Sequence, residues 1–164
     1  MELHEAARSG DVAILWSILA RSDDVDSRDI LGLTPLMEAC CAGHHECARA
    51  LIEAGANVDV KDDDNYTALM EACFRGRFEC ARALVDAHAD LELTRRESKS
   101  ARMIACERPP SHSPVSARQG KASCAQIVLE AMAPLRDADH HDRAASLKLT
   151  CERFQQLEVV LTTQ

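Results

Sequence analysis

The sequence repeats itself with an offset of 33 residues, and this constrains the fold more than any other feature. The segment Thr34–Cys40 (TPLMEAC) returns as Thr67–Cys73 (TALMEAC), and Glu46–Leu51 (ECARAL) returns unchanged as Glu79–Leu84. A period of this length is one supersecondary unit, which cannot bury its apolar face alone and must stack against neighbouring copies. The chain is therefore expected to form an elongated stack of similar units.

Two less regular copies flank this pair. Counting back by the same offset gives a first copy that starts at Leu3 without an opening turn, and counting forward gives a fourth that starts at Ser100. In the fourth copy Arg102 stands at a leucine position, and the turn glycine expected at position 109 is a proline. The pattern resumes at Gly120, which the alignment assigns as the displaced turn glycine. The fourth copy is thus predicted to carry an 11-residue insertion.

The repeated unit resembles the ankyrin repeat. The motifs that carry the resemblance in the second copy are Thr34-Pro35-Leu36, Ala39, Gly43-His44, Leu51-Ile52 and Gly55-Ala56-Asn57-Val58-Asp59. The resemblance implies an all-α solenoid of about four helix-turn-helix repeats with short β-turn hairpins. The residues fit this fold, because Thr34 is suited to cap a helix that begins with proline, and Gly43 is suited to end it.

Domain boundaries follow from the repeat. The ankyrin region is predicted to span 1–132, with a truncated first repeat at 1–28, full repeats at 29–61 and 62–94, and a fourth at 95–132 containing an inserted loop at 109–119. Residues 133–164 are predicted to hold a linker and a C-terminal amphipathic helix. Asn65 replaces a turn glycine, which is tolerable because asparagine adopts left-handed conformations. His88 replaces a cap glycine, a costlier change if that position requires positive φ.

The insertion has the composition of a flexible loop. Residues 107–121 contain three prolines and three serines and show little apolar periodicity. Ser113-Pro114 within it is a minimal proline-directed phosphorylation motif. We therefore predict that 107–121 connects the two helices of the fourth repeat without regular structure.

Composition excludes several function classes. The chain has 27 Asp and Glu residues against 19 Lys and Arg, a net charge of −8, which disfavours nucleic-acid binding through counterion release. The N-terminal residues lack the charged and apolar regions of a secretory signal, and no apolar run approaches the roughly 18 residues that span a bilayer. The expected location is cytoplasmic, with the nucleus as a second compartment.

The eight cysteines suggest a zinc site at first sight, because three thiols and two imidazoles fall within residues 40–47. The 33-residue repeat, called the lattice below, explains six of them better. One repeat position holds Cys40, Cys73 and Cys106, and another holds Cys47, Cys80 and Cys124. Both positions are expected to pack between repeats as small apolar residues. We predict no metal and no other cofactor, and we expect the off-lattice Cys41 and Cys151 to be labelled fastest by thiol reagents.

No catalytic constellation is evident. Glu38 and Glu71 recur at one helix position, but no nucleophile, base or phosphate-binding loop accompanies them at fixed spacing. His44 lies in the turn between the helices, where the resemblance implies a structural role in tying loop backbones together. The chain is therefore predicted not to be an enzyme.

The resemblance instead implies a protein-interaction module or adaptor, with a concave surface of hairpin tips and inner helices. The positions that match partner-facing positions of the family are Ile30, Leu31, Leu33, Cys41, Ala42, Asp63, Asp64, Tyr66, Phe74 and Arg75. We expect the apolar members to be exposed and to contribute most to binding. Because residues 1–94 carry 19 acids and 8 bases, the expected partner is a protein with a basic or mixed-charge surface, bound by a monomer.

The tail permits a second interpretation. Leu147, Cys151, Phe154, Leu157 and Leu161 are spaced as one face of a helix, which is expected to cover the open end of the fourth repeat. Ser146, Leu147 and Cys151 are also similar to the opening of a SOCS box, which implies docking to elongin C. The alternative function is therefore a substrate-recognition adaptor of a ubiquitin ligase through a degenerate SOCS-box-like tail.

Overall fold

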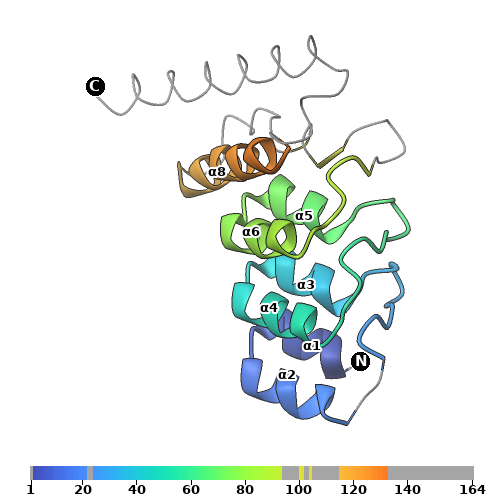
Figure 1. Cartoon of the computed structure of the whole chain (residues 1–164). Helices are drawn as coiled ribbons and strands as arrows, with labels where there is room; N and C mark the ends of the chain where they lie inside the picture. The colour runs from blue at the N-terminus through green and yellow to red at the C-terminus, as the bar shows by residue number, and fades with distance from the viewer. Residues whose placement is uncertain (1, 22–23, 94–99, 102–103, 105–114, 133–164) are drawn as a thin grey trace.

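The computed structural model is a stack of short helix pairs (Figure 1). It describes residues 2–21, 24–93, 100, 101, 104 and 115–132. The helices of this part are α1 (Glu2–Ser9), α2 (Val12–Leu19), α3 (Pro35–Ala42), α4 (His45–Glu53), α5 (Ala68–Arg75), α6 (Phe78–Asp86) and α8 (Val115–Ala131). The predicted all-α solenoid is confirmed. The tail segment 133–164, with its expected helix and its SOCS-box-like residues, lies outside the described residues.

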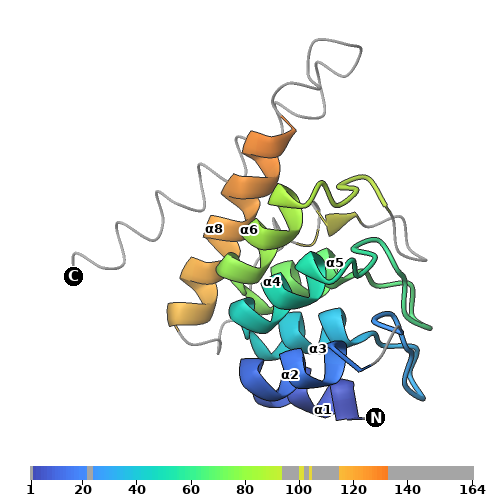
Figure 2. The same cartoon turned by 60° about the horizontal axis from the view of Figure 1, so that its bottom comes forward.

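The helices form two layers. Helices α1, α3 and α5 pack side by side as an inner layer, and α2, α4 and α6 form an outer layer that α8 extends (Figures 1 and 2). Helix α8 packs against both α5 and α6. The loops that precede α3 and α5 project from one edge of the stack. The apolar core runs the length of the stack between the two layers.

Local sequence sets where the inner helices begin and end. Thr34 accepts a hydrogen bond from the Met37 N–H at 3.3 Å, and Thr67 accepts one from the Met70 N–H at the same distance. Gly43 ends α3 with a φ of 91°. The predicted cap and turn of the second repeat are confirmed. The threonine caps stabilise the helices because the backbone N–H groups of a first helical turn otherwise have no acceptor within the helix. Asn65 and His88 also have positive φ, at 64° and 60°, so the condition under which His88 is the costlier replacement is met.

The turns between helices are packed closely by the following repeat. A Cβ built on Gly10 would lie 2.5 Å from Nδ1 of His44, so the His44 ring covers that turn. A Cβ on Gly43 would lie 2.9 Å from Cδ of Arg77, one repeat later. His44 forms no side-chain capping bond to the helix that follows it, so it stabilises the turn by packing.

The prediction for Gly120 was wrong. Gly120 lies inside α8, so residues 115–121 are helical and not part of a flexible loop. A Cβ at this position would overlap the carbonyl oxygen of Gly76, so the packing of α8 on that turn requires a glycine even though glycine is unfavourable within a helix. The repeat pattern correctly singled out Gly120, but this glycine packs within a helix against the turn at Gly76 and does not form a turn itself. The expected loop from 107 to 114 lies outside the described residues.

Five of the six lattice cysteines are part of the core, and the sixth, Cys106, lies outside the described residues. Cys40, Cys47, Cys73, Cys80 and Cys124 retain at most 1 % of their surface, which confirms their packing role. Contact with the Cys80 thiol and complete burial raise the pKa of Cys40, so its thiol is protonated at neutral pH. Among the described residues, no group of three or more His, Cys, Asp or Glu side chains is placed to hold a metal ion. No helix in the described part is long and apolar enough to span a bilayer.

Candidate protein-binding surface

The hairpin tip of the second repeat is built around Asp29. Its Oδ1 accepts the N–H groups of Leu31 at 2.8 Å and Leu33 at 2.9 Å. Its own N–H donates to the Leu33 carbonyl at 3.0 Å, and its carbonyl accepts the N–H of Gly32 at 3.0 Å. Four hydrogen bonds within five residues fix the backbone of this tip.

The third repeat builds its tip in the same way around Asp62. Its Oδ1 accepts the N–H groups of Asp64 at 2.9 Å and Tyr66 at 2.8 Å, and its N–H donates to the Tyr66 carbonyl at 2.9 Å. Burial raises the pKa of Asp62 above its ordinary value, although the two backbone N–H bonds act in the opposite direction. The 33-residue spacing of Asp29 and Asp62 was visible in the sequence, but their role as the acceptors of the tips was not predicted.

The two tips are joined to each other. The Asp63 N–H donates to the Leu31 carbonyl at 3.3 Å. The Arg28 guanidinium donates to the Lys61 carbonyl at 2.7 Å and lies 3.6 Å from the Asp63 carboxylate. The tips therefore form one continuous, hydrogen-bonded edge of the stack.

Three of the five apolar residues predicted at this surface are exposed. Ile30 retains 95 % of its surface, Leu31 60 % and Phe74 48 %. Leu33 and Tyr66 are partly buried and pack against the core, so the prediction that they are exposed was wrong. Each follows the turn of its tip at the point where the chain returns to the helices, which directs its side chain inward.

An ion pair and a thiol–carboxylate hydrogen bond connect the inner helices of successive repeats. Arg8 donates to both carboxylate oxygens of Glu38, at 2.6 Å and 3.2 Å. One repeat later the Cys41 thiol donates to Glu71 at 3.2 Å, and Arg75 donates to the same carboxylate oxygen at 3.0 Å. The exposed Arg75 is thus committed to a neighbour on its own helix.

Cys41 is less accessible than predicted. It is half-buried, and burial together with the Glu71 carboxylate raises the pKa of its thiol to about 12. Since the thiolate is the reactive form, fast labelling of Cys41 is no longer expected. The neighbouring Ala42, also predicted at this surface, is half-buried as well.

Phe74 occupies the position of Arg8 and Cys41 in the third repeat. Its ring faces Lys121 of α8, with Nζ 4.8 Å from the ring centroid, which is a cation–π distance. The prediction that 107–121 is a loop hid this contact, because a residue in an irregular loop has no fixed register with α5. Lys121 is buried, whereas Phe74 retains 48 % of its surface beside this contact.

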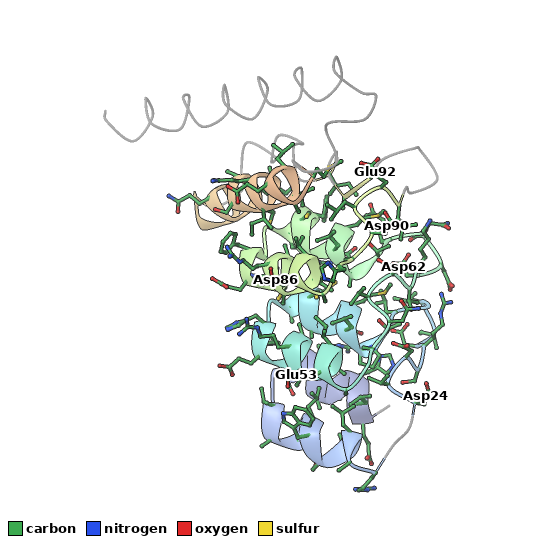
Figure 3. All side chains as sticks on the ribbon, in the orientation of Figure 1. Asp24, Glu53, Asp62, Asp86, Asp90 and Glu92 are labelled. Atoms are coloured by element: carbon green, nitrogen blue, oxygen red, sulfur yellow. The ribbon has the colours of Figure 1, made fainter. Side chains whose placement is uncertain are left out.

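The acids along the hairpin edge divide into two groups. Asp26 accepts the Asn57 N–H at 3.0 Å, and Asp59 accepts the Asp90 N–H at 2.8 Å, so these carboxylates link one repeat to the next. Asp63 and Asp64 at the third tip are exposed. Figure 3 places Asp24, Asp62 and Asp90 along this edge. Part of the acidic character of the edge therefore arises from groups that build the stack.

Comparison with known proteins agrees with this architecture. A sequence model described as ankyrin repeats in three copies matches residues 3–96. The chain is 48 % identical over 52 residues to ankyrin repeat domain-containing protein 29 of Danio rerio, covering 31 % of this chain and 17 % of that protein. It is 41 % identical over 56 residues to inversin of Gallus gallus, covering 34 % of this chain and 5 % of that protein.

These matches concern the repeats and not whole proteins, because the chain spans less than a fifth of either relative. The ankyrin-repeat family model nevertheless matches more than half of the chain, and residues 3–96 contain all but the first residue of α1, and helices α2 to α6 with their turns and both hairpin tips. The chain belongs to the ankyrin-repeat family.

Proposed function

We propose that the protein is a non-catalytic interaction module that binds a partner protein across its hairpin tips and inner helices. The observation that carries this proposal is the exposure of Ile30 and Leu31, at 95 % and 60 %, on a tip whose backbone is held by four hydrogen bonds. The tip would form with polar residues at these positions, as the third repeat shows with Asp63 and Asp64. Their apolar side chains therefore have no role in folding and suit a protein contact.

The surroundings suggest the chemistry of the partner. Next to the apolar tip lie the exposed carboxylates of Asp63 and Asp64, and across the inner helices lies the exposed half of Phe74. A partner that fits places an apolar side chain on Ile30 and Leu31 and a basic group near the third tip. Charges around such a contact favour fast association and selectivity more than affinity.

The test is a proximity-labelling or pull-down comparison of the wild-type chain with Ile30→Ser, Leu31→Ser. Partners that use this face are expected to be lost from the variant, while its melting temperature stays within about 2 °C, because exposed side chains contribute little to stability. The matched control is Glu79→Ser, Arg82→Ser, which changes two exposed residues of α6 and leaves the net charge unchanged. Retention of every partner by the tip variant would refute the proposal.

A further inference from the structure

Helix α2 presents apolar residues to solvent where the two equivalent helices present charges. The outward-facing positions are occupied by Glu46, Arg49 and Glu53 in α4, by Glu79, Arg82 and Asp86 in α6, and by Ala13, Trp16 and Ala20 in and just after α2. All nine side chains are exposed, and Trp16 retains 44 % of its surface. The repeat lattice therefore identifies α2 as the exception.

Ile14 extends the same apolar surface. Its counterparts, Cys47 and Cys80, are buried, and Cys80 contacts Cys40 of the preceding repeat. This position thus faces the N-terminal side of each repeat, so Ile14 faces away from α4 and remains 52 % exposed. We refer to Ala13, Ile14, Trp16 and Ala20 together as the α2 patch.

Folding does not require the α2 patch. Leu15 anchors α2 with no exposed surface, and Val12, Ile18 and Leu19 pack partly against the core. The corresponding helices achieve the same packing with charged residues outside. Trp16 and Ile14 lie two residues apart, at the two sides of the exposed face of α2, and large exposed apolar side chains of this kind are typical of a contact with another molecule.

Carboxylates border the α2 patch. Asp11 caps α2 and is exposed. Burial raises the pKa of the Cys47 thiol, and the nearby carboxylates of Asp11 and Glu46 raise it further. Both acids therefore lie near the N-terminal ends of α2 and α4. Figure 3 places Glu53 at the opposite end of α4, beside α2. The bases beside these acids are Arg49 of α4 and the exposed Arg21 directly after the patch. Two copies of a chain with net charge −8 would bring these carboxylates together, so charge favours a basic partner over a second copy.

We propose that the α2 patch docks an amphipathic helix of a partner protein, with an apolar face against Trp16 and Ile14 and with Lys or Arg residues flanking that face. Helix α2 offers about two turns of apolar surface, which suits a contact of moderate affinity. The patch belongs to the outer layer, whereas the hairpin tips project beside the inner layer (Figure 1). The two surfaces can therefore be occupied at the same time.

Trp16 is the sole tryptophan of the chain, so its fluorescence reports directly on the α2 patch. The probes are two synthetic 18-residue helical peptides with the same leucine face, one flanked by lysines and the other by glutamates. We expect the Leu/Lys peptide to shift the Trp16 emission to shorter wavelength, to saturate, and to protect Trp16 from acrylamide at least tenfold more strongly than the Leu/Glu peptide.

Charge reversal locates the binding site. The double variant Glu46→Lys, Glu53→Lys is expected to bind the Leu/Lys peptide at least tenfold more weakly than the wild type and to bind the Leu/Glu peptide more tightly. The matched control, Glu79→Lys, Asp86→Lys, makes the same change in net charge at the equivalent positions of α6 and should leave the affinity within about twofold. Ile30→Ser, Leu31→Ser should also leave it unchanged, which separates this proposal from the function proposed for the tips.

Four results would overturn the proposal. The Trp16 emission could stay unchanged up to millimolar Leu/Lys peptide, or the two peptides could bind equally well. The α6 variant could lose as much affinity as the α4 variant, which would indicate attraction to an acidic chain without a defined site. If the emission instead shifts with protein concentration alone and sedimentation shows a dimer, the occupant is a second copy of the chain and not a basic helix.

Discussion

The second and third repeats share a backbone and differ at the surface. Asp29 and Asp62 accept equivalent pairs of N–H groups, and the residues that follow each turn, Leu33 and Tyr66, both pack against the core. Between these shared positions the second tip carries Ile30 and Leu31, whereas the third carries two aspartates. Positions that repeat in both chemistry and geometry build the fold, and positions that repeat only in geometry are available for binding.

The junctions after these repeats differ in the same manner. At Gly43 the following repeat places the flexible side chain of Arg77, and at Gly76 helix α8 places its own backbone at Gly120. The first junction can adjust to an added methyl group by moving a side chain. The second cannot, because a Cβ would meet a carbonyl of the main chain.

The largest effect is therefore expected from Gly120→Ala. Overlap of the new Cβ with the Gly76 carbonyl should lower the free energy of unfolding by about 3 kcal/mol and expose α8 to faster hydrogen exchange. The control is Gly55→Ala, which has a φ of +89° but no atom within 4 Å of its Cβ and should lose only about 1 kcal/mol. Equal losses measured by urea unfolding would show that α8 does not pack on the turn as described.

The aspartates of the tips come next. Asp29→Ala and Asp62→Ala each remove the acceptor of two backbone N–H groups and should lower the free energy of unfolding by about 2 kcal/mol. Asp62→Asn retains an oxygen acceptor and should lose less than half as much. A full loss in the asparagine variant would mean that the negative charge, and not the acceptor oxygen, holds the tip together.

The pH dependence of Asp62 has a defined sign. Burial raises its pKa in the folded state above 3.8, so the folded protein binds this proton more tightly than the unfolded chain does. The stability that Asp62 contributes is fully present below its unfolded pKa and is lost as the pH rises through its folded pKa. The difference in unfolding free energy between wild type and Asp62→Asn should therefore shift against the wild type as the pH rises from 3 to 6.

The second repeat carries Cys41 where the third carries Phe74, and the reactivity of this thiol tests its contact with Glu71. With a pKa of about 12 against an ordinary value of 9.0, its thiolate fraction at pH 8 should be lower by a hundredfold or more. Alkylation by iodoacetamide, followed by mass spectrometry, should be correspondingly slow. Glu71→Gln removes the carboxylate that raises this pKa and should accelerate the reaction, while burial keeps the rate below that of a free thiol. A wild-type rate equal to that of glutathione would contradict the thiol–carboxylate contact.

The sequence predicted the parts of the fold that depend on one repeat alone. Thr34 and Gly43 act where the pattern places them, because capping and left-handed turns are local properties of the chain. Periodicity could not show whether Gly120 forms a turn or a helix contact, since either use requires a residue without a Cβ.

The candidate site was less predictable from the sequence. Matching Leu33 to a partner-facing position left open whether its side chain lies on the core or the solvent side of the tip. The exposure of Ile30 was predicted correctly from its matching family position. The Trp16 surface was not predicted, because it is recognised only when α2 is compared with its counterparts 33 and 66 residues along the chain.

The smallest effect on stability is also the most direct test of the central claim, that the apolar tip of the second repeat serves binding and not folding. The measurement is urea unfolding of Ile30→Asp, Leu31→Asp, which gives the second tip the side chains of the third, beside Leu33→Ser as a change on the core side. The account predicts that the double variant stays within about 0.5 kcal/mol of wild type, whereas Leu33→Ser loses about 1.5 kcal/mol or more. Equal losses from the two variants would contradict the account, because Ile30 and Leu31 would then be part of the folded core.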